Sequence, residues 1–367
     1  MSSAGYGSGE IPGRIAENIK TCITTEMADK YAYTDVLHSF GIDVLPENGV
    51  KGRGLAIYGK RILEYQTALG VEAQDDYERL NKITTICEEM RDAWKGRRAK
   101  PIPVIPEKPV WSEFSNTDDF DKAISDKRLL PVGYNAEDAS VYSIDLSKIY
   151  CYLVTGLPRS GKKNFLRVVL QSAIKKNADV CIIDGNTKYL EAYKDEDCVT
   201  YVDSEESLFD YYSKMIPEFQ RRNKIKRDLI AQDLEEEEVY EVISNERPII
   251  ILISDFIWYM KAVYEGKNNI NGFLENITEK GKLHNIFFFG VVGLDKINEV
   301  DYRKAFKLFI SSKTGVHFGG NSGSNRYFNF DSIPYKEQAK MYKAGIGLES
   351  SEMADGVIKM IVPLARR

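Results

Sequence analysis

The stretch G-L-P-R-S-G-K-K at residues 156–163 decides the fold of this 367-residue chain. It fits the phosphate-loop pattern G-x-x-x-x-G-K, in which backbone N–H groups cradle phosphates and the lysine reaches their β and γ oxygens. A Ser or Thr normally follows that lysine and holds Mg²⁺ through its hydroxyl. Here Lys163 follows Lys162. The pattern therefore predicts a nucleotide site whose metal-binding position is altered.

The residues on either side of this loop support the same interpretation. Residues 149–155 (IYCYLVT) are a β-branched and aromatic run that predicts a strand, and residues 164–175 (NFLRVVLQSAIK) carry apolar residues at helical spacing. Strand, glycine loop and helix is the order that a phosphate loop requires, and the alternative is an ordinary glycine turn. The predicted nucleotide-binding residues are Gly156, Leu157, Pro158, Arg159, Ser160, Gly161, Lys162, Lys163 and Asn164.

Further apolar runs alternate with helical patterns after the loop. The runs predict strands at residues 180–184, 198–202, 249–254 and 286–292, and the longest helical pattern spans residues 205 to about 242. Continuous apolar strands that alternate with helices are typical of a parallel sheet covered on both faces. We therefore expect an α/β, RecA-like domain with a mostly parallel sheet.

Two predicted strands end in an aspartate that is a candidate for the second acidic motif, which holds Mg²⁺. We favour Asp255 over Asp184, because its distance from the loop leaves room for the intervening strands, and we interpret Asp184 as a turn residue. Phe256 follows, where a hydrolysing enzyme carries a carboxylate that activates water. Loss of a positioned base costs about 10²–10⁴ in rate. Little or no ATP hydrolysis is expected.

Composition narrows the classes of partner. The net charge is -5 with a pI near 5.6, which disfavours a nucleic-acid-binding surface. The five cysteines and three histidines show no zinc-site spacing. No stretch approaches the roughly 20 apolar residues of a membrane helix. We expect a cytoplasmic chain with reduced cysteines and no membrane segment or transition metal.

The chain divides into modules by composition. Residues 1–10 are Gly/Ser-rich and expected to be flexible, and residues 99–110 form a Pro-rich linker. Residues 11–98 resemble the back half of a module that recurs in full at 111–367. In both, a Gly-rich segment (KGRGL at 51–55, AGIGL at 344–348) lies between apolar runs, which we expect to be strands at residues 19–25, 306–313 and 357–363.

These segments, in this order, resemble a known family. The sequence IPGRIAENIKTCITTEMADKYAYTDVL at residues 11–37, followed by GRGL and EYQTAL, is similar to the end of an FtsK/SpoIIIE-type ATPase module. PVGYN at 131–135, the phosphate loop and a long RR-containing helix before IIILISD resemble the last ATPase domain of EssC/EccC proteins of type VII secretion. The resemblance covers nearly the whole chain.

The resemblance implies a membrane-anchored protein with tandem cytosolic ATPase modules, which exports helical-hairpin substrates of the WXG type. Gly156, Gly161, Lys162 and Asp255 then fall on nucleotide-site positions, with ATP and Mg²⁺ as cofactors. Lys163 and Phe256 depart from an active site. The departures favour a degenerate module that recognises substrate and regulates the motor, in contact with upstream ATPase modules.

Several alternatives remain open. One alternative is that the domain is an active motor that holds Mg²⁺ on Asp255. A second alternative, which the net charge disfavours, is a DNA translocase. Homo-oligomers of active relatives share an arginine between neighbours, for which Arg14 and Arg53 are candidates by residue type. Basic residues at 221–227 are interpreted as a solvated helix surface rather than a partner site. Aromatic residues at 256–259 are interpreted as core, with an apolar groove as the alternative.

Overall fold

A computed structural model describes residues 11, 13–16, 18–19, 21–96, 103–350 and 356–366. The chain forms two compact units, Met1–Lys100 and Pro101–Arg367. The segment 1–10, expected to be flexible, and residues 99–102 of the expected linker lie outside the described residues. No helix in the described ranges has both the length and the apolar character needed to cross a bilayer.

The first unit contains a small antiparallel sheet in the order β1-β2-β3. A core of Tyr33, Leu37, Ile42 and Leu55 holds it against helix α2. Its elements are α1 (Gly13–Ala16), β1 (Ile23–Thr24), α2 (Lys30–Leu37), β2 (Arg53–Tyr58), β3 (Arg61–Gln66) and α3 (Asp76–Ala93).

Helix α3 follows this sheet and begins at the N-cap Asp75, whose side chain accepts a hydrogen bond from the N–H of Glu78 at 2.7 Å. No residue of α3 is buried, and Leu80, Met90 and Trp94 are among the exposed large apolar residues. The large apolar residues of α3 therefore lie on the surface of the unit as described.

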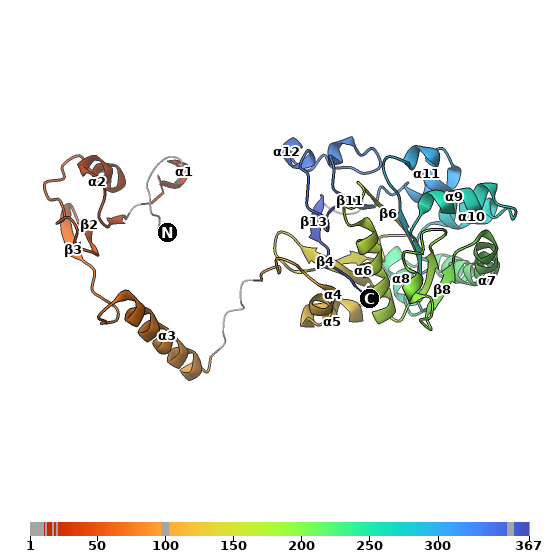
Figure 1. Cartoon of the computed structure of the whole chain (residues 1–367), viewed down its shortest axis with the longest axis horizontal. Helices are drawn as coiled ribbons and strands as arrows, with labels where there is room; N and C mark the ends of the chain where they lie inside the picture. Colours follow the sequence, from red (N-terminus) through yellow and green to blue (C-terminus); the bar gives the residue numbers. More distant parts are fainter. Residues whose placement is uncertain are drawn as a thin grey trace. The chain divides into compact units, whose positions relative to one another are not determined.

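The second unit is built on a ten-stranded sheet in the order β5-β4-β13-β12-β11-β6-β10-β9-β7-β8. The six strands from β11 to β8 are parallel, and the others are antiparallel. Figure 1 labels β4, β6, β8, β11 and β13 of this unit. The strands are β4 (Leu129–Asn135), β5 (Val141–Asp145), β6 (Cys151–Gly156), β7 (Asp179–Ile183), β8 (Val199–Val202), β9 (Ile249–Ile253), β10 (Ile286–Val291), β11 (Gly315–Phe318), β12 (Ile346–Ser350) and β13 (Ile358–Ile361).

Helices cover both faces of this sheet. Residues of α6 pack in the core on one face, and residues of α7, α9, α10 and α11 pack in the core on the other. The helices are α4 (Trp111–Phe114), α5 (Asp118–Ser125), α6 (Lys162–Lys175), α7 (Glu205–Ile230), α8 (Glu236–Ile243), α9 (Phe256–Glu265), α10 (Asn271–Lys280), α11 (Lys304–Phe309) and α12 (Tyr335–Gln338), with 3-10 turns η1 (Glu191–Tyr193), η2 (Ile297–Glu299) and η3 (Ser322–Ser324). The predicted α/β, mostly parallel fold is confirmed.

Two predicted elements are wrong. Residues 306–313 do not form a strand, because Ala305, Phe306 and Phe309 lie at helical spacing and are buried on one side of α11. The long helical pattern from residue 205 to about 242 is two helices, α7 and α8, and Asp233 between them has a left-handed backbone with φ of 59°.

The strand that corresponds to β1 of the first unit is β11. In the first unit β1 pairs with β2 and β2 with β3, all antiparallel. In the second unit β11, β12 and β13 pair in the same order and sense. The segments GRGL (52–55) and GIGL (345–348) each begin one residue before the middle strand of these three and continue into it. The similarity between the two units therefore lies in this three-strand pattern.

Candidate nucleotide site

The predicted phosphate loop borders a cavity of about 590 Å³ at the carboxyl ends of β6, β9 and β10. Ligands of doubly wound α/β folds bind at this edge of the sheet. The cavity is lined by Pro158, Arg159, Ser160, Gly161, Lys162, Lys163, Asn164, Thr187, Ser254, Asp255, Ile257, Val291, Val292, Gly293, Asp295 and Lys296. Four of these side chains are cationic and two are carboxylates, and the loop leads into the N-terminus of α6, which favours an anionic ligand.

The two glycines of the loop are required by close neighbours. Gly156 has φ of 141°, and a Cβ there would lie 2.0 Å from the carbonyl oxygen of Phe318. Gly161 has φ of 112°, and a Cβ there would lie 2.8 Å from the nitrogen of Gly345. That nitrogen donates to the carbonyl of Ser160 at 3.0 Å. The loop is thus held against β11 and the start of β12 by its backbone.

The Lys162 ammonium turns back onto the loop. Its Nζ donates to the carbonyl oxygens of Gly156 at 2.8 Å and Leu157 at 2.6 Å. Burial lowers the pKa of Lys162, and the nearby carboxylate of Asp295 opposes that shift. A bound phosphate would therefore have to share this ammonium with the loop carbonyls.

Lys163 lies beside an aromatic ring. Its Nζ is 4.9 Å from the centre of the Tyr189 ring, and the Arg167 guanidinium carbon is 4.6 Å from the same centre. Lys163 still borders the cavity, so it adds positive charge where a magnesium ligand is expected.

The remaining hydroxyls of the cavity are engaged within the protein. Ser160 donates to the carbonyl of Leu157 at 2.8 Å. Thr187 and Ser254 both donate to Asp184. Among the cavity-lining residues, none supplies a hydroxyl in place of the one lost at Lys163, so the phosphate-binding half of the motif fits a nucleotide and the metal-binding half does not fit the usual Mg²⁺ arrangement.

Asn164, a predicted nucleotide-site residue, binds the C-terminal segment. Its Nδ2 donates to the carbonyl of Pro363 at 2.9 Å, and its Oδ1 accepts from the N–H of Ala365 at 3.0 Å. Both side-chain atoms are therefore used to fix residues 363–365 against α6.

Asp255 and Phe256 differ in their relation to the cavity. Asp255 lines the cavity and caps helix α9, accepting from the N–H groups of Ile257 and Trp258 at 3.1 Å. Phe256 is fully buried, with its ring 4.8 Å from that of Phe309. The side chain of Phe256 therefore packs in the core and offers no polar group to the cavity.

Ser254 is the first residue after β9 and was missed by the sequence analysis. Its hydroxyl donates to the carboxylate of Asp184, which also accepts from the N–H of Leu190 at 2.8 Å and the hydroxyl of Tyr201 at 2.9 Å. Asp184 is fully buried and fixes the turn after β7, as interpreted from the sequence. Ser254 and Asp255 are thus the residues that the end of β9 presents to the cavity.

Asp295 and Lys296 were also missed. They follow β10 at the same edge of the sheet and line the cavity. The sequence signal that could have found them is the predicted strand at residues 286–292. The loops after parallel strands meet at one edge of the sheet, so residues that follow this strand lie near the phosphate loop.

The basic cluster at residues 221–227 is largely structural. The guanidinium of Arg222 is buried and donates to the carbonyls of His284, Asn285 and Arg247 at 2.8–3.1 Å. Lys226 donates to the carbonyls of Lys280 and Lys282. These contacts fasten α7 to the loops at the amino edge of the sheet, so the cluster is not simply a solvated surface.

The aromatic residues after Asp255 do not form an apolar groove. Phe256 and Tyr259 are buried, and a Cβ on Gly185 would lie 2.5 Å from the ring of Trp258. The core interpretation fits these positions.

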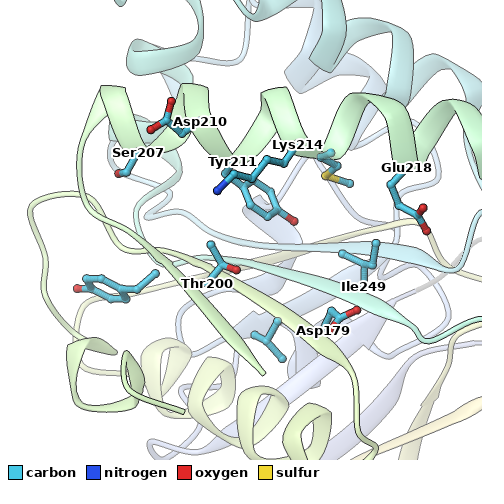
Figure 2. A pocket seen from close by; sticks show the side chains of 11 residues that line it. Asp179, Thr200, Ser207, Asp210, Tyr211, Lys214, Glu218 and Ile249 are labelled. Carbon is cyan, nitrogen blue, oxygen red and sulfur yellow. The ribbon is translucent and has the colours of Figure 1, made fainter. Parts of the chain in front are cut away.

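A second cavity, of about 420 Å³, lies between α7 and the strands β7 and β8. Figure 2 shows Tyr211 and Lys214 projecting from α7 toward the strand that carries Thr200. Asp179 and Ile249 at the amino ends of β7 and β9 also line it. This cavity is therefore distinct from the candidate nucleotide site.

The two candidate trans arginines lie in the first unit. Arg53 forms ion pairs with Glu47 at 2.8 Å and Glu64 at 3.3 Å, and Arg14 is exposed in α1. Arg53 would have to give up these ion pairs to contact a nucleotide bound by a neighbouring subunit.

Comparison with known proteins places this geometry in context. No family model matches the chain. The ESX secretion system protein EccC of Geobacillus thermodenitrificans is 25% identical over 212 residues, which are 57% of this chain and 14% of EccC. The chain thus spans about one seventh of the length of that relative.

Solved structures show the same fold. The structure of EssC ATPases 2 and 3 from G. thermodenitrificans superposes with a TM-score of 0.68 at 18% identity, covering 98% of this chain and 63% of that one. Thermomonospora curvata EccC ATPases 2 and 3, solved in complex with a signal sequence peptide, gives 0.55 at 16% identity, covering 88% and 55%. The chain is therefore a homologue of EssC/EccC-type proteins of type VII secretion and has the fold of their ATPase domains.

Proposed function

We propose that this chain is a degenerate ATPase-like domain of a type VII secretion motor, which recognises secreted WXG-type substrates and regulates the motor. The observation that carries the proposal is that the phosphate loop keeps its phosphate-binding lysine but has lost the hydroxyl that binds the metal. Lys162 is kept at the loop, while Lys163 replaces the metal-binding hydroxyl and lies on Tyr189. Such a site holds a nucleotide better than it hydrolyses one.

The nucleotide is held by the phosphate-binding half of the site. The loop backbone, the N-terminus of α6 and the ammonium of Lys162 meet the phosphates. Arg159 and Lys296 add positive charge to the cavity wall. ATP is the proposed ligand, and Lys163 supplies part of the charge that Mg²⁺ contributes in an active enzyme.

Hydrolysis is slow in this proposal because two groups that act together are altered. The hydroxyl that holds Mg²⁺ is lost at Lys163, and the first residue after β9 is Ser254 rather than an acid. Asp255 is the remaining carboxylate at this strand end, and its Oδ1 is used to cap α9. Loss of metal-assisted charge stabilisation and of a free base lowers phosphoryl-transfer rates by orders of magnitude.

The relatives support a role in substrate recognition. T. curvata EccC ATPases 2 and 3 were solved with a signal sequence peptide, so a domain of this fold has bound such a peptide. In the proposal this chain binds the corresponding segment of a WXG-type partner, contacts adjacent ATPase modules of a membrane-anchored cytosolic protein, and forms homo-oligomers. Nucleic acid is not a proposed ligand, and no helix in the described part of this chain could be the membrane anchor.

The first experiment measures nucleotide binding. A fluorescent ATP analogue is titrated into the purified chain with and without EDTA, and affinity that changes less than about threefold supports a metal-independent site. Lys162→Ala is the matched loss-of-binding variant, because it removes the phosphate-contacting ammonium. Affinity that disappears with EDTA contradicts the proposal.

The second experiment measures substrate capture. A fluorescent C-terminal peptide of a WXG-type partner is titrated with and without ATP, beside a sequence-scrambled peptide. Binding of the native peptide alone supports the receptor function. Equal binding of both peptides, or of neither, rejects it.

An active motor is the second candidate, and the cavity-lining carboxylate of Asp255 favours it. Brisk steady-state ATP hydrolysis that Asp255→Asn abolishes would establish the motor and remove the degenerate-site proposal. A DNA translocase is the least favoured candidate, because the net charge is -5. A salt-dependent shift of a DNA probe would revive it.

A further inference from the structure

A third cavity, of about 190 Å³, lies at the opposite edge of the sheet from the phosphate loop. Ile149 and Thr314, which come just before β6 and β11, both line it, whereas the phosphate loop follows the other end of β6. The described residues around it are Tyr142, Ser143, Ile144, Asp145, Lys148, Ile149, Thr314, Glu349, Gly356 and Ile358. The cavity is therefore separate from the candidate nucleotide site.

Glu349 is the unusual residue of this cavity. It lies on β12, opposite Val316 of β11 and Ile358 of β13, and is 6% exposed. Its Oε2 is buried and has no hydrogen-bond partner in the described part of the chain. Burial raises the pKa of Glu349 to about 8. A buried polar atom without a partner destabilises a fold, so a ligand that pairs with it would offset that cost.

The charges around Glu349 define what such a ligand must carry. Oδ1 of Asp145 accepts from the N–H of Ser147 at 2.9 Å and from its hydroxyl at 2.6 Å. Lys148 Nζ lies 3.8 Å from Oδ2 of Asp145. Among the described lining residues these two charges cancel, so an ionised Glu349 leaves one formal negative charge. The complementary ligand is a monovalent cation.

The remaining walls favour an organic cation. Ile144, Ile149 and Ile358 give an aliphatic lining, and the volume corresponds to about six water-sized groups. In the described ranges no three His, Cys, Asp or Glu side chains are grouped so that they could hold a metal ion. We propose that this cavity binds an aliphatic ammonium group, with Glu349 as its counter-ion.

The ammonium group has two sources with the same chemistry. It belongs either to a small free alkylamine or to a lysine side chain of a peptide. The probes that distinguish them are n-butylamine and the blocked tripeptide acetyl-Gly-Lys-Gly-amide. Neither carries phosphate, so the outcome is independent of the nucleotide site.

The experiment is calorimetric titration of the whole chain at pH 7, in two buffers of different ionisation enthalpy. Glu349 is mostly protonated at this pH, so binding of the ammonium should release close to one proton. Affinity should increase about fifty-fold between pH 6 and pH 8, as the ionised fraction of the carboxyl rises. The other titratable groups that line the cavity are Asp145, Lys148 and Tyr142. D145N tests how much the Asp145–Lys148 pair contributes to the pH dependence of binding.

Glu349→Gln should abolish saturable binding, and Glu113→Gln, an exposed glutamate on α4, should leave it unchanged. Binding of both probes assigns a lysine side chain as an acceptable ligand, and binding of butylamine alone restricts the site to free amines. Absence of saturation, binding without proton release, or unchanged binding in Glu349→Gln overturns the proposal. The proton release is measured on the unmodified chain, so it decides the question even where the variant unfolds.

Discussion

The Lys163 ammonium lies 4.9 Å from the centre of the Tyr189 ring, on the wall of the candidate nucleotide site. A cation held over an aromatic face is stabilised by about 0.5–2 kcal/mol. The contact holds positive charge beside the phosphate loop, where an active enzyme carries Mg²⁺ on a hydroxyl. The replacement therefore alters the charge balance of the site as well as its ligand set.

Lys163→Thr should make nucleotide binding depend on magnesium. The change removes a cation that repels Mg²⁺ and restores the hydroxyl that the pattern normally supplies. We expect nucleotide affinity to fall about tenfold in EDTA for the variant and to remain nearly constant for the natural chain. Fluorescence titration measures both, and Lys163→Met, which removes charge without adding a ligand, is the control. Equal EDTA sensitivity of Lys163→Thr and Lys163→Met would falsify this assignment.

Asp184→Asn should destabilise the second unit. The carboxylate accepts hydrogen bonds from Thr187, Leu190, Tyr201 and Ser254, and an amide cannot accept all of them. Unsatisfied buried donors should lower the free energy of unfolding by about 2–4 kcal/mol. Urea denaturation measures the change. Asp195→Asn, an exposed aspartate in the loop after β7, is the matched control, and equal loss in both variants would contradict the argument.

The contrast between Asp184 and the phosphate loop explains what the sequence could predict. Loop, strand and helix are contiguous from residue 149 to 175, so local pattern was sufficient to place Gly156, Gly161 and Lys162. Asp184 and Ser254 are 70 residues apart and meet because β7 and β9 are neighbours in the sheet. Strand order is not written in local spacing, so this contact and the one between Lys163 and Tyr189 were missed.

The same reasoning applies to the fold. Runs such as residues 249–253 are buried on both faces, and their continuous apolar character predicted strands correctly. Residues 306–313 were wrongly predicted as a strand, because a short apolar run is ambiguous between a strand and one buried face of a helix. The sequence alone did not show that Asp255 lines the cavity while Phe256 turns into the core.

Arg222→Met should destabilise the second unit strongly, whereas Lys224→Met should not. Arg222 is buried, pairs with Glu218 at 2.7 Å and donates to three backbone carbonyls. Its loss removes the hydrogen bonds to the carbonyls of His284 and Arg247 and one of the two that the Asn285 carbonyl accepts, while Glu218 keeps its pair with Arg221. This loss should cost about 3 kcal/mol in unfolding free energy. Thermal or urea denaturation of the two variants checks this.

Lys224 belongs to the same basic cluster but is exposed, so it separates a structural role from a charge effect. Comparable stability of both variants, together with weakened binding to a partner, would instead assign the cluster to an interface.

Stability should fall as the pH drops from 6.5 toward 4, through His284 and His317. Burial lowers the pKa of both imidazoles to about 4, against 6.5 for an unperturbed histidine. Between these two pH values the unfolded chain binds more protons than the native one, so the free energy of unfolding decreases with acidification. Each histidine contributes up to about 1.4 kcal/mol per pH unit in that window and nothing above it.

His317→Asn isolates one of these contributions. Nδ1 of His317 lies 3.1 Å from the hydroxyl of Thr155 and 3.3 Å from Nδ2 of Asn325. Thr155 is the residue directly before the phosphate loop. The difference in unfolding free energy between variant and natural chain should change with pH from 4 to 6.5 and stay constant from 7 to 8. Comparing the two chains cancels the carboxyl groups that titrate in the same range. A difference that is independent of pH across the whole range would show that folding does not shift the pKa of His317.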